Sequence, residues 1–254
     1  MKYLVTGHTG FKGSWLVAKL KIEGHEVFGI SLNPPKKSHF NLAQINQYMD
    51  RDIRVDIRDL EFLEKIVMEL NPEVVVHLAA QSLVLESYRN PINTYETNIN
   101  GTLNILKSCS NIDGLKAVAI VTSDKVYKSS PKKSFVETDP LGGDDPYSSS
   151  KAAADLLTQA WRTSFGKVPI SIARAGNVIG GGDWSKNRII PDLVNSLKGN
   201  KEFLLRYPHS VRPWQHVLDC LNGYQMLVQQ QINSGLQGEW NFGPDVNCML
   251  QLAT

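Results

Sequence analysis

The sequence has no long hydrophobic run, few cysteines and almost no excess of charge of either sign. No stretch approaches the ~20 apolar residues that a transmembrane helix needs, and the amino terminus, MKYLVTGHTG, has too short an apolar run for a signal peptide. Cys109, Cys220 and Cys248 lie far apart and form no Cys-x-x-Cys pair, which excludes a zinc or disulfide framework and fits reduced thiols. We therefore expect a cytoplasmic protein with no membrane association and no metal site.

The charge balance also argues against nucleic acid as a partner. The net charge is +2, and the Lys-Lys pairs at 36–37 and 132–133 are too short to form a polyanion-binding patch. With 254 residues, 42% of them apolar and 20% charged, the chain can bury a full core. The composition thus indicates an ordinary globular protein of one domain, or of one domain with a small lobe.

Strand-like and helix-like segments alternate along the chain, and several strands are continuously apolar, as in a parallel sheet that is covered on both faces. In the helical segment 91–108, apolar residues recur every three or four positions. The alternation predicts an α/β fold, a Rossmann-type doubly wound parallel sheet with right-handed crossovers. The expected strands are 3–5, 27–32, 53–55, 74–80, 117–122, 170–175, 203–205 and 239–242, and the expected helices are 14–23, 60–70, 91–108, 147–165, 189–198 and 217–231.

A glycine-rich turn joins the first expected strand to the first helix. Gly7 permits a tight turn, Gly10 lets the backbone approach a pyrophosphate, and Gly13 lets the helix pack close to the strand. The helix amino terminus adds amide donors and partial positive charge, so the turn predicts a nucleotide cofactor, with a purely structural turn as the alternative. The cofactor-binding residues expected here are Gly7, Thr9, Gly10, Phe11, Lys12 and Gly13, whereas His8 fits a loop residue better than a catalyst.

The acidic residue that would indicate NAD rather than NADP is absent from the end of the second strand. That strand ends Ser31-Leu32-Asn33, with neither an acid nor an arginine, so NAD and NADP both remain open. Asp56 and Ile57, after the short strand at 53–55, are candidates for contacting the adenine. The alternative for Asp56 is to cap the helix that starts near Asp59.

A tyrosine and a lysine four residues apart open the helix at 147–165, so Tyr147 and Lys151 share one face. An ammonium group beside a phenol favours the phenolate and lowers its pKa from about 10, which would make Tyr147 a general base on an alcohol. Some twenty residues earlier, Ser123, Asp124 and Lys125 follow an apolar strand. They form either a solvated strand end or a catalytic acid and base, and because side chains alternate along a strand, Asp124 and Lys125 can both reach a substrate only if the strand has ended by Ser123.

Several motifs carry a resemblance to a known family and cover essentially the whole chain. The chain resembles the nucleotide-sugar 4,6-dehydratases of the extended short-chain dehydrogenase/reductase family, most closely the subgroup that acts on CDP-glucose. The motifs are 5-VTGHTGFKGSWL-16, 77-HLAAQSLV-84, 122-TSDKVY-127, 142-GGDDPYSSSKAAAD-155, 173-ARAGNVIGGGDW-184, 188-RIIPD-192 and 212-RPWQHVLD-219.

The resemblance implies a reaction in three steps: oxidation at C4 of the sugar, loss of water across C5 and C6, and return of the hydride to C6. Tyr147, Lys151 and Ser123 would act on O4, and Asp124 would protonate the leaving hydroxyl. Lys125 stands where dTDP-glucose dehydratases carry a glutamate, and it would be either the C5–H base, which requires a lowered pKa, or an electrostatic stabiliser of the enolate.

The resemblance also implies the ligands and their contacts. NAD, with NADP not excluded, would contact Thr122, Tyr147, Lys151, Leu78, Ala79 and Gln81. Asn177, Arg188 and Arg212 would bind the nucleoside-diphosphate sugar, with a surface role as the alternative for Arg188. A homodimer would form through 91–108 and 147–165, and the product would enter deoxysugar biosynthesis of the kind that supplies lipopolysaccharide O-antigen.

The chain departs from the family pattern in two places. Leu85 stands where relatives carry an arginine, and relatives continue beyond 243–254 with a further substrate-binding segment. We therefore expect an NAD(P)-binding Rossmann domain over 1–176 and a truncated substrate region over 177–254, mixed with the last Rossmann helix and strand at 217–243. Two alternatives stay open: another nucleotide-sugar epimerase or reductase, which would need only Ser123, Tyr147 and Lys151, and a non-catalytic NAD-binding remnant.

Overall fold

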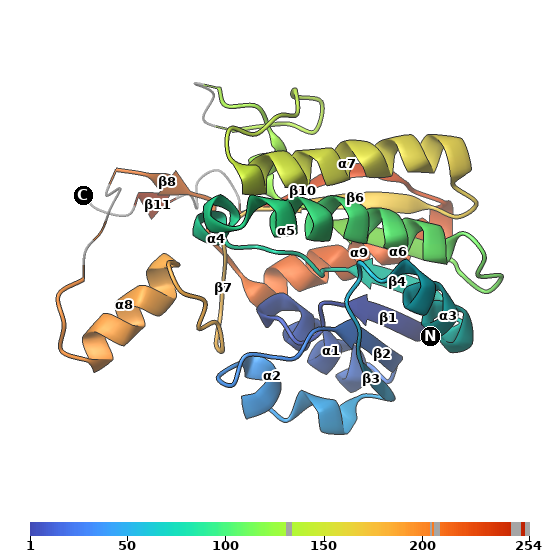
Figure 1. Ribbon diagram of the computed structural model, residues 1–254, viewed down its shortest axis with the longest axis horizontal. Coiled ribbons are helices and arrows are strands. Elements are labelled where there is room, and N and C mark those ends of the chain that lie inside the picture. The colour runs from blue at the N-terminus through green and yellow to red at the C-terminus, as the bar shows by residue number, and fades with distance from the viewer. Residues whose placement is uncertain (131–133, 204, 206–208, 245–249, 252–254) are drawn as a thin grey trace.

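The centre of the molecule is a parallel sheet of seven strands in the order β10-β6-β5-β4-β1-β2-β3 (Figure 1). The computed structural model describes residues 1–130, 134–203, 205, 209–244 and 250–251. The strands are β1 (Lys2–Thr6), β2 (Glu26–Ser31), β3 (Arg51–Arg54), β4 (Val74–His77), β5 (Ala117–Val121), β6 (Ile170–Ala175) and β10 (Gly238–Phe242). The order confirms the predicted doubly wound sheet.

Two hydrophobic cores, one on each face, hold helices against the sheet. Tyr3 and Val5 of β1 point into a core closed by α1 (Phe11–Ile22) and α9 (Val217–Ser234). Leu4 points into the opposite core, as the alternation of side chains along a strand requires. That second core is closed by α3 (Leu60–Leu70), α6 (Gly101–Cys109) and α7 (Pro146–Phe165).

Shorter elements fill the connections and gather at one end of the molecule. Figure 1 shows β7, α8, β8 and β11 together at the end opposite the marked amino terminus. The pairs are β7 with β9 and β8 with β11. The shorter elements are α2 (His39–Leu42), η1 (Ile45–Tyr48), α4 (Val84–Arg89), α5 (Pro91–Tyr95), η2 (Glu96–Asn100), η3 (Asp124–Val126), β7 (Val178–Ile179), α8 (Ile189–Lys198), β8 (Val211–Arg212), β9 (Gln215–His216) and β11 (Leu250–Gln251).

Some predicted elements differ from the observed ones. The strand expected at 74–80 ends at His77, because the backbone of Ala79 packs against Gly7. The helix expected at 91–108 is broken by the π-helical turn η2, and α2, η1 and α4 were not predicted. Of the strand expected at 203–205, Leu204 lies outside the described residues, and its two neighbours belong to no strand.

The π-helical turn decides which side of the segment 91–108 is buried. Ile92 is 70% exposed, while Asn98 and Thr102 are buried and hydrogen-bonded. The buried side of this segment is therefore partly polar, and part of its apolar side faces outward. Within the described part of the chain, no helix is both long and apolar enough to cross a membrane.

The amino terminus of α3 is capped by Asp59, whose Oδ1 accepts a hydrogen bond of 3.2 Å from the backbone N of Phe62. The alternative that Asp56 caps this helix is wrong, because the Asp56 carboxylate is bound by Arg58 at 2.6 Å.

Replacing Asp59 with alanine should lower the free energy of unfolding by about 1 kcal/mol, because α3 loses the side chain that caps its amino terminus. Denaturant unfolding at neutral pH measures the loss, and Asp59→Ser, which keeps a capping oxygen, is the matched control. Equal stabilities of the alanine and serine variants would contradict the capping role.

Candidate active site

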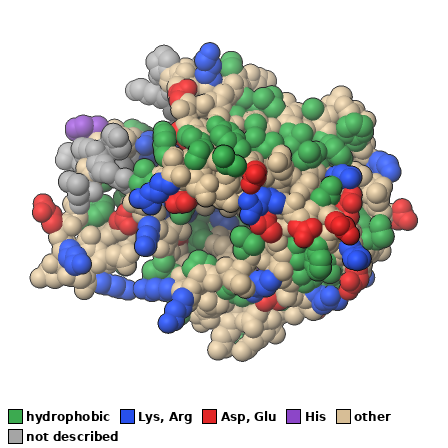
Figure 2. Space-filling model, in the orientation of Figure 1, with side chains coloured by type: hydrophobic (Ala, Val, Ile, Leu, Met, Phe, Trp, Pro, Cys, Tyr) green, Lys and Arg blue, Asp and Glu red, His purple; other side chains and the backbone are tan. Residues whose placement is uncertain are grey.

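Four connecting segments meet at the carboxyl edge of the sheet, because parallel strands all end on the same side. They follow β1, β4, β5 and β6, and they carry most of the predicted site residues. Figure 2 shows the molecule hollowed near its middle, with Lys and Arg side chains along the rim.

The glycine turn after β1 leaves no room for side chains at two of its glycines. A Cβ on Gly7, whose φ is +73°, would lie 2.6 Å from the backbone N of Ala79. A Cβ on Gly13 would lie 2.2 Å from the carbonyl oxygen of Gly7. The turn therefore brings the backbones of β1, α1 and the β4 loop into direct contact.

The first turn of α1 has the features of an anion-binding helix terminus. Gly10 is its N-cap, without a side-chain hydrogen bond, and no acidic residue lies in the turn. Thr9 donates to the carbonyl oxygen of Leu32 at 3.0 Å and thereby ties the turn to the end of β2. Amides without a side-chain cap, under an open glycine backbone, fit the pyrophosphate of a dinucleotide.

His8, between these residues, is fully buried. Its Nε2 lies 2.6 Å from Oδ1 of Asp52, and burial lowers the pKa of its imidazole below the usual value. These contacts agree with a loop residue that supports the turn from beneath.

Leu78 and Ala79 lie against Gly7 of the turn, whereas Asp56 and Ile57 lie beside the segment 93–101. Ile57 is buried against Gly101, and Leu78 and Ala79 pack against the two cores. Leu78, Ala79 and Asp56 are each partly exposed and could face a ligand, whereas Ile57 is buried.

Gln81 holds the loop after β4 rather than pointing freely into the hollow. Its amide nitrogen donates to the carbonyl oxygen of Leu83 at 3.1 Å and to Oγ1 of Thr94 at 2.9 Å. Its backbone N donates to Oδ1 of Asn98 at 2.8 Å. Gln81, the expected cofactor contact, therefore has a side chain that is already hydrogen-bonded to Leu83 and Thr94.

The segment after β5 meets the geometric condition for its side chains to reach one site. The strand ends at Val121, and η3 begins at Asp124. Ser123 donates to Oδ1 of Asp124 at 3.0 Å. Burial raises the pKa of the Asp124 carboxyl, opposed by that hydrogen bond and by nearby cations, whereas Lys125 is exposed.

The helix α7 presents Tyr147 and Lys151 at the same edge, both buried. Its first turn is fixed by Asp145, whose Oδ1 accepts from the backbone N of Tyr147 at 3.0 Å. Lys151 Nζ donates to the carbonyl oxygen of Val121 at 3.1 Å, which joins α7 to the end of β5.

The expected lowering of the pKa of Tyr147 by Lys151 is wrong for the protein as it stands. Burial raises the pKa of Tyr147, although the neighbouring Ser123 hydroxyl opposes the shift. The Lys151 ammonium is bound to the backbone of β5 instead of to the phenol. Burial and the charge of Lys12 lower the pKa of Lys151 to about 8.

Lys12 lies deeper than a turn residue would suggest. Its Nζ donates to the hydroxyl of Tyr224 on α9 at 3.2 Å, and its charge acts on the pKa of both Lys151 and Asp124. Sequence reasoning missed Tyr224, and no local pattern around it in α9 would have indicated this contact.

The three predicted substrate-binding residues lie on the segments after β6. Arg188 donates to Oδ2 of Asp183 at 3.2 Å and to Oγ of Ser82 at 3.4 Å, so it bridges the segment after β6 to the loop after β4. Arg212 lies on β8 and its charge acts on Asp124. The backbone of Asn177 pairs with the segment that contains β9.

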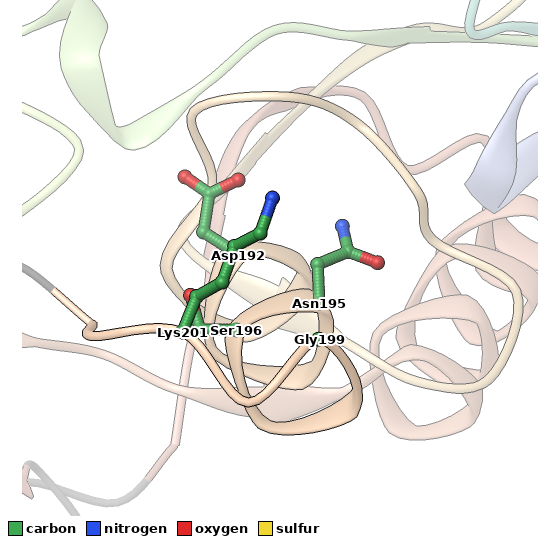
Figure 3. A pocket seen from close by; sticks show the side chains of 5 residues that line it. All are labelled: Asp192, Asn195, Ser196, Gly199 and Lys201. Atoms are coloured by element: carbon green, nitrogen blue, oxygen red, sulfur yellow. The ribbon is translucent and has the colours of Figure 1, made fainter.

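A separate small pocket of about 300 Å³ lies on α8 and the segment after it (Figure 3). None of the residues that line it is among the predicted site residues. They are Asp192, Asn195, Ser196, Gly199 and Lys201.

Known proteins with a similar sequence or fold place this site in a family. The sequence profile of the GDP-mannose 4,6 dehydratase family matches residues 4–239. A CDP-glucose 4,6-dehydratase of Salmonella typhimurium is 44% identical over 96% of this chain and 71% of its own length.

Solved structures agree on the fold. A dTDP-glucose 4,6-dehydratase from Streptomyces venezuelae, solved with NAD, is 29% identical with a TM-score of 0.83, over 96% of this chain and 76% of that one. A UDP-glucose 4-epimerase from Thermotoga maritima is 25% identical with a TM-score of 0.85, over 99% of this chain and 79% of that one. The chain belongs to the nucleotide-sugar 4,6-dehydratase family of extended short-chain dehydrogenases/reductases.

Proposed function

We propose that this chain is an NAD-dependent hydro-lyase that converts CDP-glucose to CDP-4-keto-6-deoxyglucose. The observation that carries the proposal is Asp124, a carboxyl with a raised pKa that is hydrogen-bonded to Ser123 beside Tyr147. An oxidation at C4 alone needs no acid at that place. The relative from Salmonella typhimurium supports CDP-glucose as the substrate.

The cofactor would lie across the glycine turn. We assign its pyrophosphate to the first turn of α1, where Gly10, Phe11 and Gly13 present backbone and where no acidic side chain competes. Thr9 and Lys12 would complete this side. Bound there, NAD would supply hydride transfer, from C4 of the sugar and back to C6.

We assign Tyr147 to the proton of O4. The Ser123 hydroxyl lies near enough to Tyr147 to act on its pKa, so it can orient the same sugar oxygen. Lys151 lies one turn further along the same helix face, where its ammonium donates to the carbonyl oxygen of Val121 at the end of β5. The 4-ketone that results makes the C5 proton acidic.

We assign Asp124 to the leaving 6-hydroxyl. A carboxyl must be protonated to donate, and the raised pKa that burial gives Asp124 is in the required direction. Lys125 is exposed, so it lacks the burial that would make a lysine side chain a base. We therefore give it the electrostatic role, which is to stabilise the enolate that forms when the C5 proton passes to solvent water. A solvent proton returns to C5 when the hydride reaches C6.

The nucleotide end of the substrate would be held by residues after β6. The fork of a guanidinium suits a diphosphate, and Arg212 lies near enough to Asp124 for its charge to act there. We place the diphosphate at Arg212 and the sugar beside Asn177, with Arg188 closing the rim.

Incubation of the purified chain with CDP-glucose and NAD tests the function directly. We expect the base-induced chromophore of a 4-keto-6-deoxy sugar to appear. A C4 epimer without that chromophore would favour an epimerase. No product from any nucleoside-diphosphate glucose, with NAD still bound, would favour a non-catalytic NAD-binding protein.

The roles of Asp124 and Lys125 can be separated by solvent deuterium exchange at C5. Asp124→Asn should lower product formation by about 100-fold, because it removes a general acid, while exchange at C5 persists. Lys125→Met should retain exchange at a reduced rate. Lys128→Met, at another exposed lysine of the same segment, is the control, and complete loss of exchange in Lys125→Met would make Lys125 the base.

We also propose that the protein forms a homodimer through α5 and α7, which lie side by side, with Tyr95 OH 2.8 Å from Oγ of Ser149. Ile92 is 70% exposed and Leu156 is 53% exposed on these helices. Figure 2 shows hydrophobic side chains gathered over this upper part of the molecule. A contiguous apolar surface of this kind favours burial against a second copy.

Charge on this surface should separate the copies. Ile92→Glu combined with Leu156→Glu is expected to convert a dimer to a monomer in sedimentation-velocity analysis, because unpaired charges would be buried at the interface. Leu42→Glu, at an exposed leucine of α2, should leave the sedimentation coefficient unchanged. A dimer that persists in the double variant would contradict this interface.

A further inference from the structure

A buried ion pair joins the helix that carries Tyr147 and Lys151 to the strand beside β5. Asp155 of α7 and Arg174 of β6 have side chains that are 0% and 1% exposed. Arg174 binds the carboxylate with two hydrogen bonds, Nη2 to Oδ1 at 2.8 Å and Nε to Oδ2 at 2.9 Å. This bidentate geometry fixes the direction of both side chains as well as their distance.

Each partner of the pair also holds one end of the Ser123–Val126 turn. Thr122, the residue before the turn, donates from Oγ1 to Oδ2 of Asp155 at 3.1 Å. Arg174 donates from Nη1 to the hydroxyl of Tyr127, the residue after the turn, at 3.0 Å. The ion pair thus contacts both flanks of the segment that presents Ser123 and Asp124, and none of the reacting groups themselves.

The energetic cost of this arrangement points to a role other than stability. Two charges without solvent lose much of their hydration energy, and a well-packed apolar pair of similar volume is often as stable or more stable. The position of Asp155 is informative, since it follows Lys151 by four residues and lies on the same side of α7.

We propose that Asp155 is a positioning residue for the dehydration. Clamped by Arg174, it sets the place of the Ser123–Asp124 turn relative to Tyr147 and Lys151. This inference rests on the proposed function, in which Asp124 of the turn and Tyr147 of α7 act on the same sugar. The turn and α7 must then be aligned with each other.

Asp155 also affects the pKa of Lys151. The ionisable groups that act on Lys151 are Lys12 from α1 and Asp155 from its own helix, and Lys151 in turn acts on His77 of β4. Burial holds the pKa of His77 at about 3, so it is neutral. Asp155 is the group that raises the pKa of Lys151 against burial and against Lys12, so removal of its charge should lower that pKa.

The decisive variant replaces both partners, Asp155→Leu with Arg174→Met. Asp155→Asn alone leaves Arg174 buried and unpaired and should lower the melting temperature, whereas the double replacement should restore it. In the double variant kcat for CDP-glucose should still fall about 10- to 100-fold with KM nearly unchanged, because alignment is lost. The alkaline limb of its kcat profile should move to lower pH. Wild-type kcat in the stable double variant would overturn the proposal.

A matched pair at Thr122 tests the same link without disturbing the ion pair. Thr122→Val removes the hydroxyl and keeps the shape, while Thr122→Ser keeps the hydroxyl. The Thr122 side chain is buried and donates its hydrogen bond to Asp155. The valine variant should lose about 10-fold in kcat, and the serine variant should lose much less. The reverse order would assign the effect to packing of the methyl group and overturn the positioning role.

The failure of this inference can be told from the failure of the proposed function. Wild-type protein that gives no product from CDP-glucose overturns the function. NMR titration of ¹⁵N-labelled Lys151 needs no turnover and should show a lower pKa in the double variant than in the wild type. An unchanged Lys151 titration together with unchanged kcat in the variants overturns only the inference.

Discussion

The contact between the backbones of Gly7 and Ala79 is the constraint on which the site depends. A side chain at Gly7 would overlap Ala79 N, and one at Gly13 would overlap Gly7. The carboxyl ends of β1 and β4 can therefore approach each other with no side chain between them. This one backbone contact positions the glycine turn, the first turn of α1 and the loop after β4.

Around that contact, buried hydrogen bonds rather than apolar packing hold the loops in place. Oγ1 of Thr6 lies 2.7 Å from Nδ1 of His77, and Asn98 donates to the carbonyl oxygen of Gln81 at 3.0 Å and to Oγ of Ser150 at 2.9 Å. Directional bonds of this kind specify one arrangement of the loops, where an apolar contact would permit several. The catalytic edge is thus a polar layer that lies over two hydrophobic cores.

The sequence predicted the features that depend on local pattern. The glycine spacing, the end of the strand before Ser123 and the helix that opens at Tyr147 all follow from periodicity and turn chemistry, and they stand as expected. The burial of Lys151, the depth of Lys12 and the engagement of Gln81 depend on partners far away in the chain, such as Val121 and Tyr224. No pattern within a single segment contains that information.

The π-helical turn η2 has a consequence for how the molecule divides its surfaces. One additional residue in a helical turn rotates the following residues by about 100° relative to a regular helix. Before and within the turn, Thr94 and Asn98 face inward to the loop after β4, while Ile92 faces out. The same helical segment thus turns polar side chains toward the loop after β4 on one side and an apolar side chain to the outer surface on the other.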